Sequence, residues 1–151
     1  MLIAMAGLMA CGEKSEETPA SGIQPEHISM HTWVLDRLTL QFPPDATESD
    51  VSATNLDACE RDDQYRFPSG SAFALSEGGV TCVGAGKSVF RDLSGGTWTY
   101  SSADSLLTMS RNFNSQVFKM VTLTPSVMHF RQSSIDYFGS ESRYHFYFSA
   151  K

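Results

Sequence analysis

The stretch that decides the fold reads Cys59-Glu-Arg-Asp-Asp-Gln-Tyr-Arg-Phe-Pro-Ser-Gly-Ser-Ala-Phe73. It continues through a glycine-containing turn to Thr81-Cys82 and is followed closely by Gly96-Thr-Trp-Thr-Tyr100. Tyr65 and Phe67 alternate with polar residues, as in a strand with one buried face. Pro68-Ser69-Gly70 has the composition of a turn, after which Phe73 and Leu75 resume the alternation. The stretch therefore predicts a β-hairpin with a cysteine outside each strand.

Length and composition indicate one globular domain that is rich in β-structure. The chain has 151 residues, of which 41% are hydrophobic and 19% charged, so it can bury one core. Ten Phe, five Tyr and two Trp favour strands. The formal net charge is -6, and the Lys and Arg residues form no run. This composition argues against a nucleic-acid partner, which would need a basic surface.

Outward from the hairpin, the alternation predicts strands at 31–41, 65–67, 73–75, 97–101, 106–110, 116–122, 127–132 and 143–150, with a further short strand at 88–90. Trp33 and Leu35 are expected on one face of the first strand and Leu38 on the other. Residues 45–57 are expected to be a long polar loop with at most a short helix. Short connections at this spacing predict an all-β, up-and-down antiparallel β-barrel of about eight to nine strands over residues 29–151. Closure of such a meander removes its edge strands.

The N-terminus has the features of a secreted and lipidated protein. Residues 1–10 are apolar, uncharged and too short to span a bilayer, and are interpreted as a signal peptide. Leu8-Met9-Ala10-Cys11 resembles a bacterial lipobox, which implies lipidation of Cys11 and a membrane partner through that lipid. A basic region before the apolar run is lacking, so the true start is expected upstream. Residues 11–28 are rich in Glu, Ser, Pro and Gly and are expected to form a disordered tether. The alternative is a cytosolic N-terminus with a chance apolar run.

The cysteine count agrees with lipidation. If Cys11 carries lipid, Cys59 and Cys82 remain, and outside the cytoplasm this pair is expected to form a disulfide. A loop of this length would be stabilised by ~3 kcal/mol in the chain-entropy treatment. A metal site is the alternative, but no Cys-x-x-Cys or His-x-x-x-His spacing accompanies the cysteines.

Taken in order, these motifs resemble the bacterial lipocalin-like lipoproteins that are common in Bacteroidetes. The resemblance covers about residues 31–150 and rests on the ordered set rather than on any one motif. The matching positions are Trp33-Val34-Leu35, Cys59, Asp62, Tyr65, Phe67, Gly70, Phe73, Cys82, Gly96, Trp98, Tyr144, Phe146 and Phe148. His31 departs from the glycine that usually stands two residues before the first tryptophan. The resemblance implies a small up-and-down barrel and, more loosely, the binding of a ligand.

A face of large apolar side chains is the main candidate for a binding site. The residues expected to point into the barrel and contact a small hydrophobic ligand are Trp33, Phe73, Trp98, Tyr100, Phe118, Met120, Phe130 and Phe146. An eight-stranded barrel can hold one small ligand or be filled by its own side chains. The two interpretations therefore remain open: a filled core, or a pocket at the mouth lined by some of these residues.

No group of residues predicts catalysis, a metal or a cofactor. His129 and His145 fall on the faces opposite the aromatic residues and are expected to point outward. The acidic group Asp57, Glu60, Asp62 and Asp63 lacks the spacing of a calcium loop and is expected to be a solvated loop. No Gly-x-Ser-x-Gly nucleophile motif is present.

The sequence thus favours a non-enzymatic barrel that is lipid-anchored in the bacterial cell envelope, at the outer membrane, and binds a small hydrophobic molecule. The alternative is a protein-binding module with a filled core that acts through its loops, such as an inhibitor of a host enzyme. The acidic segment 45–63 would then steer a basic partner toward it.

Overall fold

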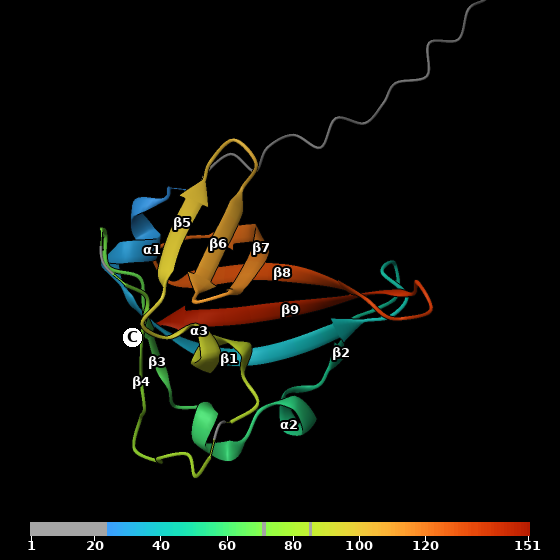
Figure 1. Ribbon diagram of the computed structural model, residues 1–151, viewed down its shortest axis with the longest axis horizontal. Coiled ribbons are helices and arrows are strands. Elements are labelled where there is room, and N and C mark those ends of the chain that lie inside the picture. Colours follow the sequence, from blue (N-terminus) through green and yellow to red (C-terminus); the bar gives the residue numbers. More distant parts are fainter. Residues whose placement is uncertain (1–23, 71, 85) are drawn as a thin grey trace, which may run out of the picture.

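The computed structural model describes residues 24–70, 72–84 and 86–151. Figure 1 shows a curled sheet with short helices at its ends. The strands are β1 (Thr32–Gln41), β2 (Ser49–Asp50), β3 (Gln64–Arg66), β4 (Ala74–Ser76), β5 (Thr97–Ser101), β6 (Leu106–Arg111), β7 (Asn114–Leu123), β8 (Val127–Ile135) and β9 (Glu141–Ala150). The helices are α1 (Glu26–Met30), α2 (Ser52–Asn55), the 3-10 turn η1 (Ala58–Glu60) and α3 (Val89–Leu93).

The strand order confirms the predicted all-β antiparallel meander. The order is β4-β3-β1-β9-β8-β7-β6-β5, with β2 paired to β1, and every pairing is antiparallel. Because β1 pairs with β9, the first and last long strands are neighbours, and the ends of the path are β4 and β5. The sequence order around the sheet is therefore that of an up-and-down barrel.

The barrel closes only partly where β4 approaches β5. The Phe73 amide donates to the Gly96 carbonyl at 2.8 Å, and the Gly95 amide donates to the Phe73 carbonyl at 2.8 Å. Within the described residues, no strand ladder continues this contact along β5. The expectation that closure removes every edge was therefore wrong, because β4 has only three residues and cannot follow β5 along its length.

The first strand departs from simple alternation. Its pairing with β9 shifts register between Leu35 and Arg37, which is the signature of a β-bulge. The extra residue moves Leu38 to the inner face, where it joins Trp33 and Leu35 in the core. The expectation that Leu38 faces away from Trp33 was wrong for this reason.

A helix replaces the short strand expected at 88–90. Ser88 precedes α3, and its hydroxyl accepts a hydrogen bond from the Phe90 amide at 3.3 Å, which is the contact of a helix N-cap. The helix buries Phe90 and Leu93. Phe90 thus enters the barrel from a helix at its end and not from a strand in its wall.

A second short helix covers the opposite end. The structure places Glu26–Met30 in α1, with Ile28 fully buried and its carbonyl accepting a hydrogen bond from Trp33 Nε1 at 3.1 Å. The described part of the chain therefore includes the last residues of the expected tether. The expected signal peptide, Cys11 and the tether up to residue 23 lie outside the described residues.

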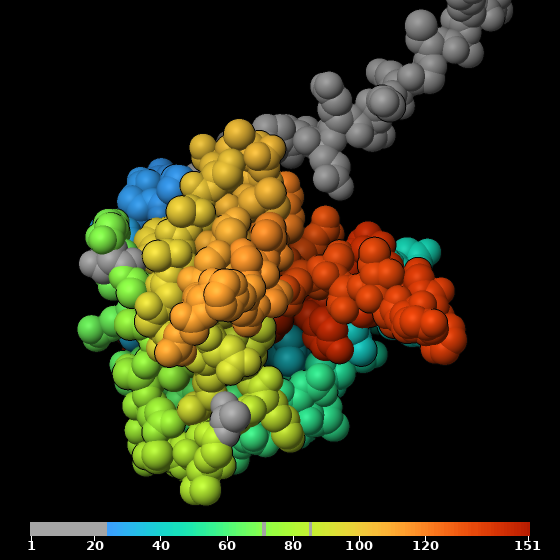
Figure 2. Space-filling model, viewed as in Figure 1, coloured from blue at the N-terminus to red at the C-terminus, as the bar shows by residue number. Residues whose placement is uncertain are grey.

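Two further features lie at the surface. The predicted disulfide is present between Cys59 and Cys82. The end of the β8–β9 hairpin projects from the body of the molecule, as Figure 2 shows in orange and red. An Arg143 guanidinium nitrogen at this hairpin donates to the Pro44 carbonyl at 3.1 Å. In the described part of the chain, no helix is long and apolar enough to cross a bilayer.

Candidate functional site: a mouth pocket and a seam groove beside a filled core

The centre of the barrel is filled by side chains. The buried core residues include Trp33, Tyr65, Phe67, Phe73, Phe90, Phe118, Phe130 and Phe148, each 0 or 1% exposed. Phe90 lies in the middle of this group, and its ring centroid is 5.2 to 5.8 Å from those of Tyr65, Phe118, Phe130, Phe146 and Phe148. Of the two interpretations that the sequence left open, the filled core is the one observed at the centre.

One recess remains at the end of the barrel next to α3, and we call it the mouth pocket. It has a volume of about 210 Å³. Its lining is Leu38, Asn55, Leu56, Lys87, Ser88, Val89, Gln132, Tyr144 and Phe146. Leu38 and Phe146 are paired neighbours on β1 and β9, and Phe146 belongs to the buried core. The mouth pocket is therefore a part of the lumen that side chains leave open.

The polar lining residues of the mouth pocket are held by specific contacts. Lys87 Nζ lies 2.9 Å from a carboxylate oxygen of Asp57, and both side chains are substantially exposed. The Gln132 amide nitrogen donates to the Gln116 side-chain oxygen at 2.5 Å. The pocket thus combines apolar side chains from the sheet with a cation and amides that can meet one polar group of a ligand.

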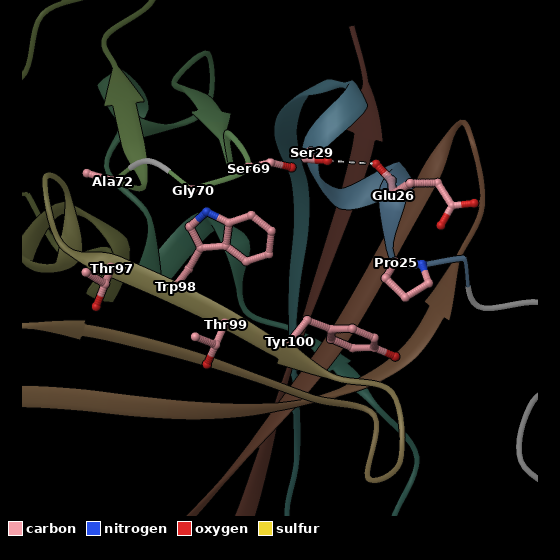
Figure 3. Close-up of a pocket in the computed structure, with 10 residues that line it drawn as sticks. All are labelled: Pro25, Glu26, Ser29, Ser69, Gly70, Ala72, Thr97, Trp98, Thr99 and Tyr100. Atoms are coloured by element: carbon pink, nitrogen blue, oxygen red, sulfur yellow. Dashed lines mark hydrogen bonds between the residues drawn. The ribbon is translucent and has the colours of Figure 1, made fainter.

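A larger cavity lies where the barrel fails to close, and we call it the seam groove. Its volume is about 790 Å³, and its lining is Pro25, Glu26, Ser29, Ser69, Gly70, Ala72, Thr97, Trp98, Thr99 and Tyr100. Figure 3 shows the indole of Trp98 between β5 and the segment that carries Ser69 and Gly70, with α1 on the other side. The groove therefore follows β5 along its unpaired side.

Two aromatic residues, Trp98 and Tyr100, determine which contacts the seam groove offers to a ligand. Trp98 Nε1 donates to the Pro68 carbonyl at 3.1 Å, and the indole packs edge-on against Phe67 with ring centroids 5.7 Å apart. The Tyr100 hydroxyl is buried and has no hydrogen-bond partner among the described residues. A buried hydroxyl without a partner costs free energy, so a ligand that supplies one would gain from it.

The residues predicted to contact a ligand fall into three places. Trp33, Phe73, Phe118, Met120 and Phe130 are at most 2% exposed in the closed core. Trp98 and Tyr100 line the seam groove, and Phe146 lines the mouth pocket. Sequence reasoning missed Leu56 and Val89 in the mouth pocket. Leu38 was also missed, because the bulge in β1 moves it to the inner face. Leu56 and Val89 were missed because they lie in or next to short helical segments, which show no alternation.

Two of the four residues in the acidic group near the disulfide, Glu60 and Asp63, are not solvated as expected. Glu60 is fully buried, and its carboxylate accepts hydrogen bonds from the backbone amides of Asp57, Lys87 and Ser88 at 2.7 to 2.9 Å. Asp63 is also fully buried and lies 3.1 Å from a guanidinium nitrogen of Arg91. Burial, together with the neighbouring charges of Glu77 and Glu60, raises the pKa of Asp63 despite the charge and hydrogen bond of Arg91. This network attaches α3 to the hairpin, because Arg91 belongs to that helix.

A polar cluster covers the outer face of β1, β8 and β9. His129 Nε2 lies 3.0 Å from His145 Nδ1, and His145 Nε2 lies 2.9 Å from the Gln41 side-chain oxygen. Tyr147 donates to Glu48 at 2.7 Å. Burial and the neighbouring His145 lower the pKa of His129 to about 4. The two histidines do lie on the outer face, but neighbouring side chains cover them, so they are only 9% and 5% exposed.

The outer cluster is not arranged as a metal centre. Over residues 24–70, 72–84 and 86–151, no three His, Cys, Asp or Glu side chains are arranged to hold a metal ion. The Gln41 oxygen requires His145 Nε2 to donate, so in the neutral pair His145 Nδ1 accepts from His129 Nε2. The histidines therefore satisfy one another within the structure.

Comparison with known proteins finds similarity at the level of solved structures. No family model matches the sequence, and no curated protein matches it. A bovine odorant binding protein in complex with a selenium-containing odorant is similar with a TM-score of 0.42 and 17% identity, over 94% of this chain and 78% of that one. A deswapped triple mutant of bovine odorant binding protein is similar with a TM-score of 0.36 and 12% identity, over 83% of this chain and 74% of that one.

Proposed function

We propose that this protein is a non-enzymatic binding protein that holds a small apolar molecule in the mouth pocket. One observation carries the proposal: the mouth pocket is a recess of the lumen that Phe90 and its neighbours do not fill. Burial of an apolar molecule against Leu38, Leu56 and Phe146 removes its surface from water, which contributes about 25 cal/mol per Å².

The size and lining of the pocket restrict the ligand. A volume of about 210 Å³ is below the range of roughly 300 to 1,000 Å³ that is typical for drug-sized molecules. We therefore infer a compact molecule with one polar group. The apolar part would lie toward Phe146, and the polar group would lie near Lys87, Ser88 or Gln132.

Titration of the full chain with indole, 1-hexanol and hexanoate tests this function. Amide chemical shifts followed by NMR should change around Val89 and Phe146 in a saturable manner for at least one of these probes. Val89→Trp and Asn55→Trp place an indole in the pocket from two different elements and should abolish the change. Val117→Trp adds the same side chain at an exposed position of β7 and should leave binding intact. Probe binding that survives both filling variants would contradict the assignment of this site.

We further infer that the protein acts in the bacterial cell envelope, anchored to the outer membrane by lipid on Cys11. The support is the lipobox-like Leu8-Met9-Ala10-Cys11 together with the pairing of the other two cysteines. Disulfides form and persist mainly outside the cytoplasm, so the Cys59–Cys82 bond agrees with export of the chain.

A further inference from the structure

The edge of β5 that faces the seam groove has no strand beside it among the described residues. β5 ends the strand order and pairs only with β6. At the start of β5, the Gly96 carbonyl accepts from the Phe73 amide, and the backbone pairing between the two ends of the sheet stops there, although the Trp98 side chain still reaches the Pro68 carbonyl. Beyond Gly96 the segment carrying Ser69 and Gly70 diverges from β5 and leaves the groove between them.

The direction of the backbone groups on this edge follows from the same hydrogen bond. The N–H and C=O groups of successive residues in a strand point to alternate sides. Because the Gly96 carbonyl points toward Phe73, the groups of Trp98 and Tyr100 point to that same side. Those of Thr97 and Thr99 point toward Ser110 and Thr108 on β6. The groove thus presents the backbone N–H donors and C=O acceptors of two residues, Trp98 and Tyr100.

The composition of β5 does nothing to prevent pairing with another strand. Exposed edge strands usually carry a lysine, a proline or a bulge that blocks a further strand. Thr97-Trp-Thr-Tyr-Ser101 is uncharged and rich in residues that favour strands, and it pairs with β6 without a register shift. The side chains of Trp98 and Tyr100 lie beside the free edge and form an apolar surface there (Figure 3).

We propose that the seam groove binds an extended peptide segment of a partner protein, which adds to β5 as a further antiparallel or parallel strand. In this mode the main chain supplies affinity and alternate side chains supply specificity. The bound segment would pair with the backbone groups of Trp98 and Tyr100 and place an apolar or aromatic side chain against their rings. This site is separate from the mouth pocket and goes beyond the function proposed above.

Charge and shape favour an extended peptide over a second copy of the chain as the occupant of the groove. Among the described residues that line the groove, Glu26 at the α1 end is the single charged one, so the bound segment is expected to carry a lysine or arginine near it. A second copy would bring its own Glu26 and a net charge of -6 to the same place. It would also bring α1 and the Ser69–Gly70 segment on both sides of its β5, whereas a single extended segment brings no such walls.

The test is a selection of random linear heptapeptides displayed on phage against the full chain. Ala72 and Ala74 are both exposed and two residues apart, but only Ala72 lines the groove. Ala72→Trp should lower the affinity of the selected peptides about tenfold or more, and Ala74→Trp should leave their affinity unchanged. Two versions of the peptide are then made, each methylated at every second backbone nitrogen. The version that loses the N–H donors facing β5 should bind about tenfold more weakly than the parent peptide.

Amide hydrogen exchange separates strand addition from contact through side chains alone. On peptide binding, the amides of Trp98 and Tyr100 should become protected, while those of Thr97 and Thr99 should keep their existing rates. The proposal is overturned if no selected peptide distinguishes the Ala72 variant from the Ala74 variant. It is equally overturned if both methylated sets bind as well as the parent peptide, or if sedimentation shows that a second copy occupies the groove. A peptide that instead perturbs Val89 and Phe146 would assign the binding to the mouth pocket.

Discussion

Phe90 occupies the position that a ligand would take in an open barrel. It is fully buried and its ring lies against aromatic side chains from β3, β7, β8 and β9. Phe90→Ala should lower the free energy of unfolding by ~3–5 kcal/mol through loss of burial and an unfilled cavity. Urea unfolding measures this, and Phe113→Ala, at a fully exposed position, is the control. A change below about 1 kcal/mol would mean that neighbouring rings collapse into the space.

His129 should make the stability depend on pH. Its pKa is about 4 in the folded state against an ordinary 6.5, so the unfolded chain binds the proton more readily. The free energy of unfolding should therefore be fully retained above pH 6.5 and fall as the pH drops from 6.5 to 4. The groups that face His129 are Glu48, which favours its charged form, and His145, Arg37 and Arg131, which disfavour it.

His129→Gln provides the comparison for this pH dependence. Glutamine can still donate to His145 Nδ1 but does not titrate. Thermal unfolding measured from pH 7.5 to 4 should show a smaller loss of stability in the variant. Partial desolvation raises the pKa of Glu48, but hydrogen bonds from Thr39 and Tyr147 and the charges of the two histidines together lower it below its ordinary value. Its contribution is lost as the pH falls below 4.5, the ordinary pKa of a glutamate carboxyl, and so overlaps the His129 window only at its lower end. Equal pH profiles for the two proteins would mean that His129 is accessible to protons in the folded state.

At the level of elements, the disulfide and the buried acids hold α3 in place. Cys59 lies in η1 beside Glu60, whose carboxylate binds the backbone just before α3. Cys82 lies in the segment between β4 and α3. The position of Phe90 in the core thus depends on contacts made outside the barrel wall.

Replacement of both cysteines should measure this contribution. Cys59→Ala combined with Cys82→Ala should lower the free energy of unfolding by ~3 kcal/mol, as expected for a bond that spans 23 positions of sequence. Urea unfolding with and without reductant gives the matched control, because reductant should destabilise the native protein and leave the double variant unchanged. Reductant that has no effect on the native protein would mean that the bond adds nothing to stability.

At the level of the whole molecule, the proposed anchoring predicts that the location of the protein depends on Cys11. When the gene is expressed in a Gram-negative host, the product should carry diacylglycerol and partition into the detergent phase of Triton X-114. Cys11→Ser should move the protein to the aqueous phase, because the acyl chains contribute ~0.8 kcal/mol per buried CH2. The double variant at Cys59 and Cys82 should remain in the detergent phase. A native protein found in the aqueous phase would contradict the anchoring.

The strands of the meander could be predicted from sequence because alternation is a local signal. The predicted strand at 97–101 has the bounds of β5, and those at 106–110, 127–132 and 143–150 fall within β6, β8 and β9. The hairpin of β3 and β4 follows from the turn at Pro68-Ser69-Gly70. The bulge after Leu35 and the helix at Phe90 were missed, because a single inserted residue and a helix of five residues leave almost no periodic pattern.

The sequence by itself determined the all-β class, the order of the antiparallel strands, the aromatic inner face and the Cys59–Cys82 pairing. Only the tertiary structure decided that the lumen is filled, that a mouth pocket remains beside Phe146, and that the barrel stays open along β5. The physical reason is that alternation identifies which face a residue occupies but carries no information on volume or on the distance between elements remote in sequence. Packing across the whole barrel decides whether Phe90 fills the space between β7 and β9 and whether β4 reaches β5.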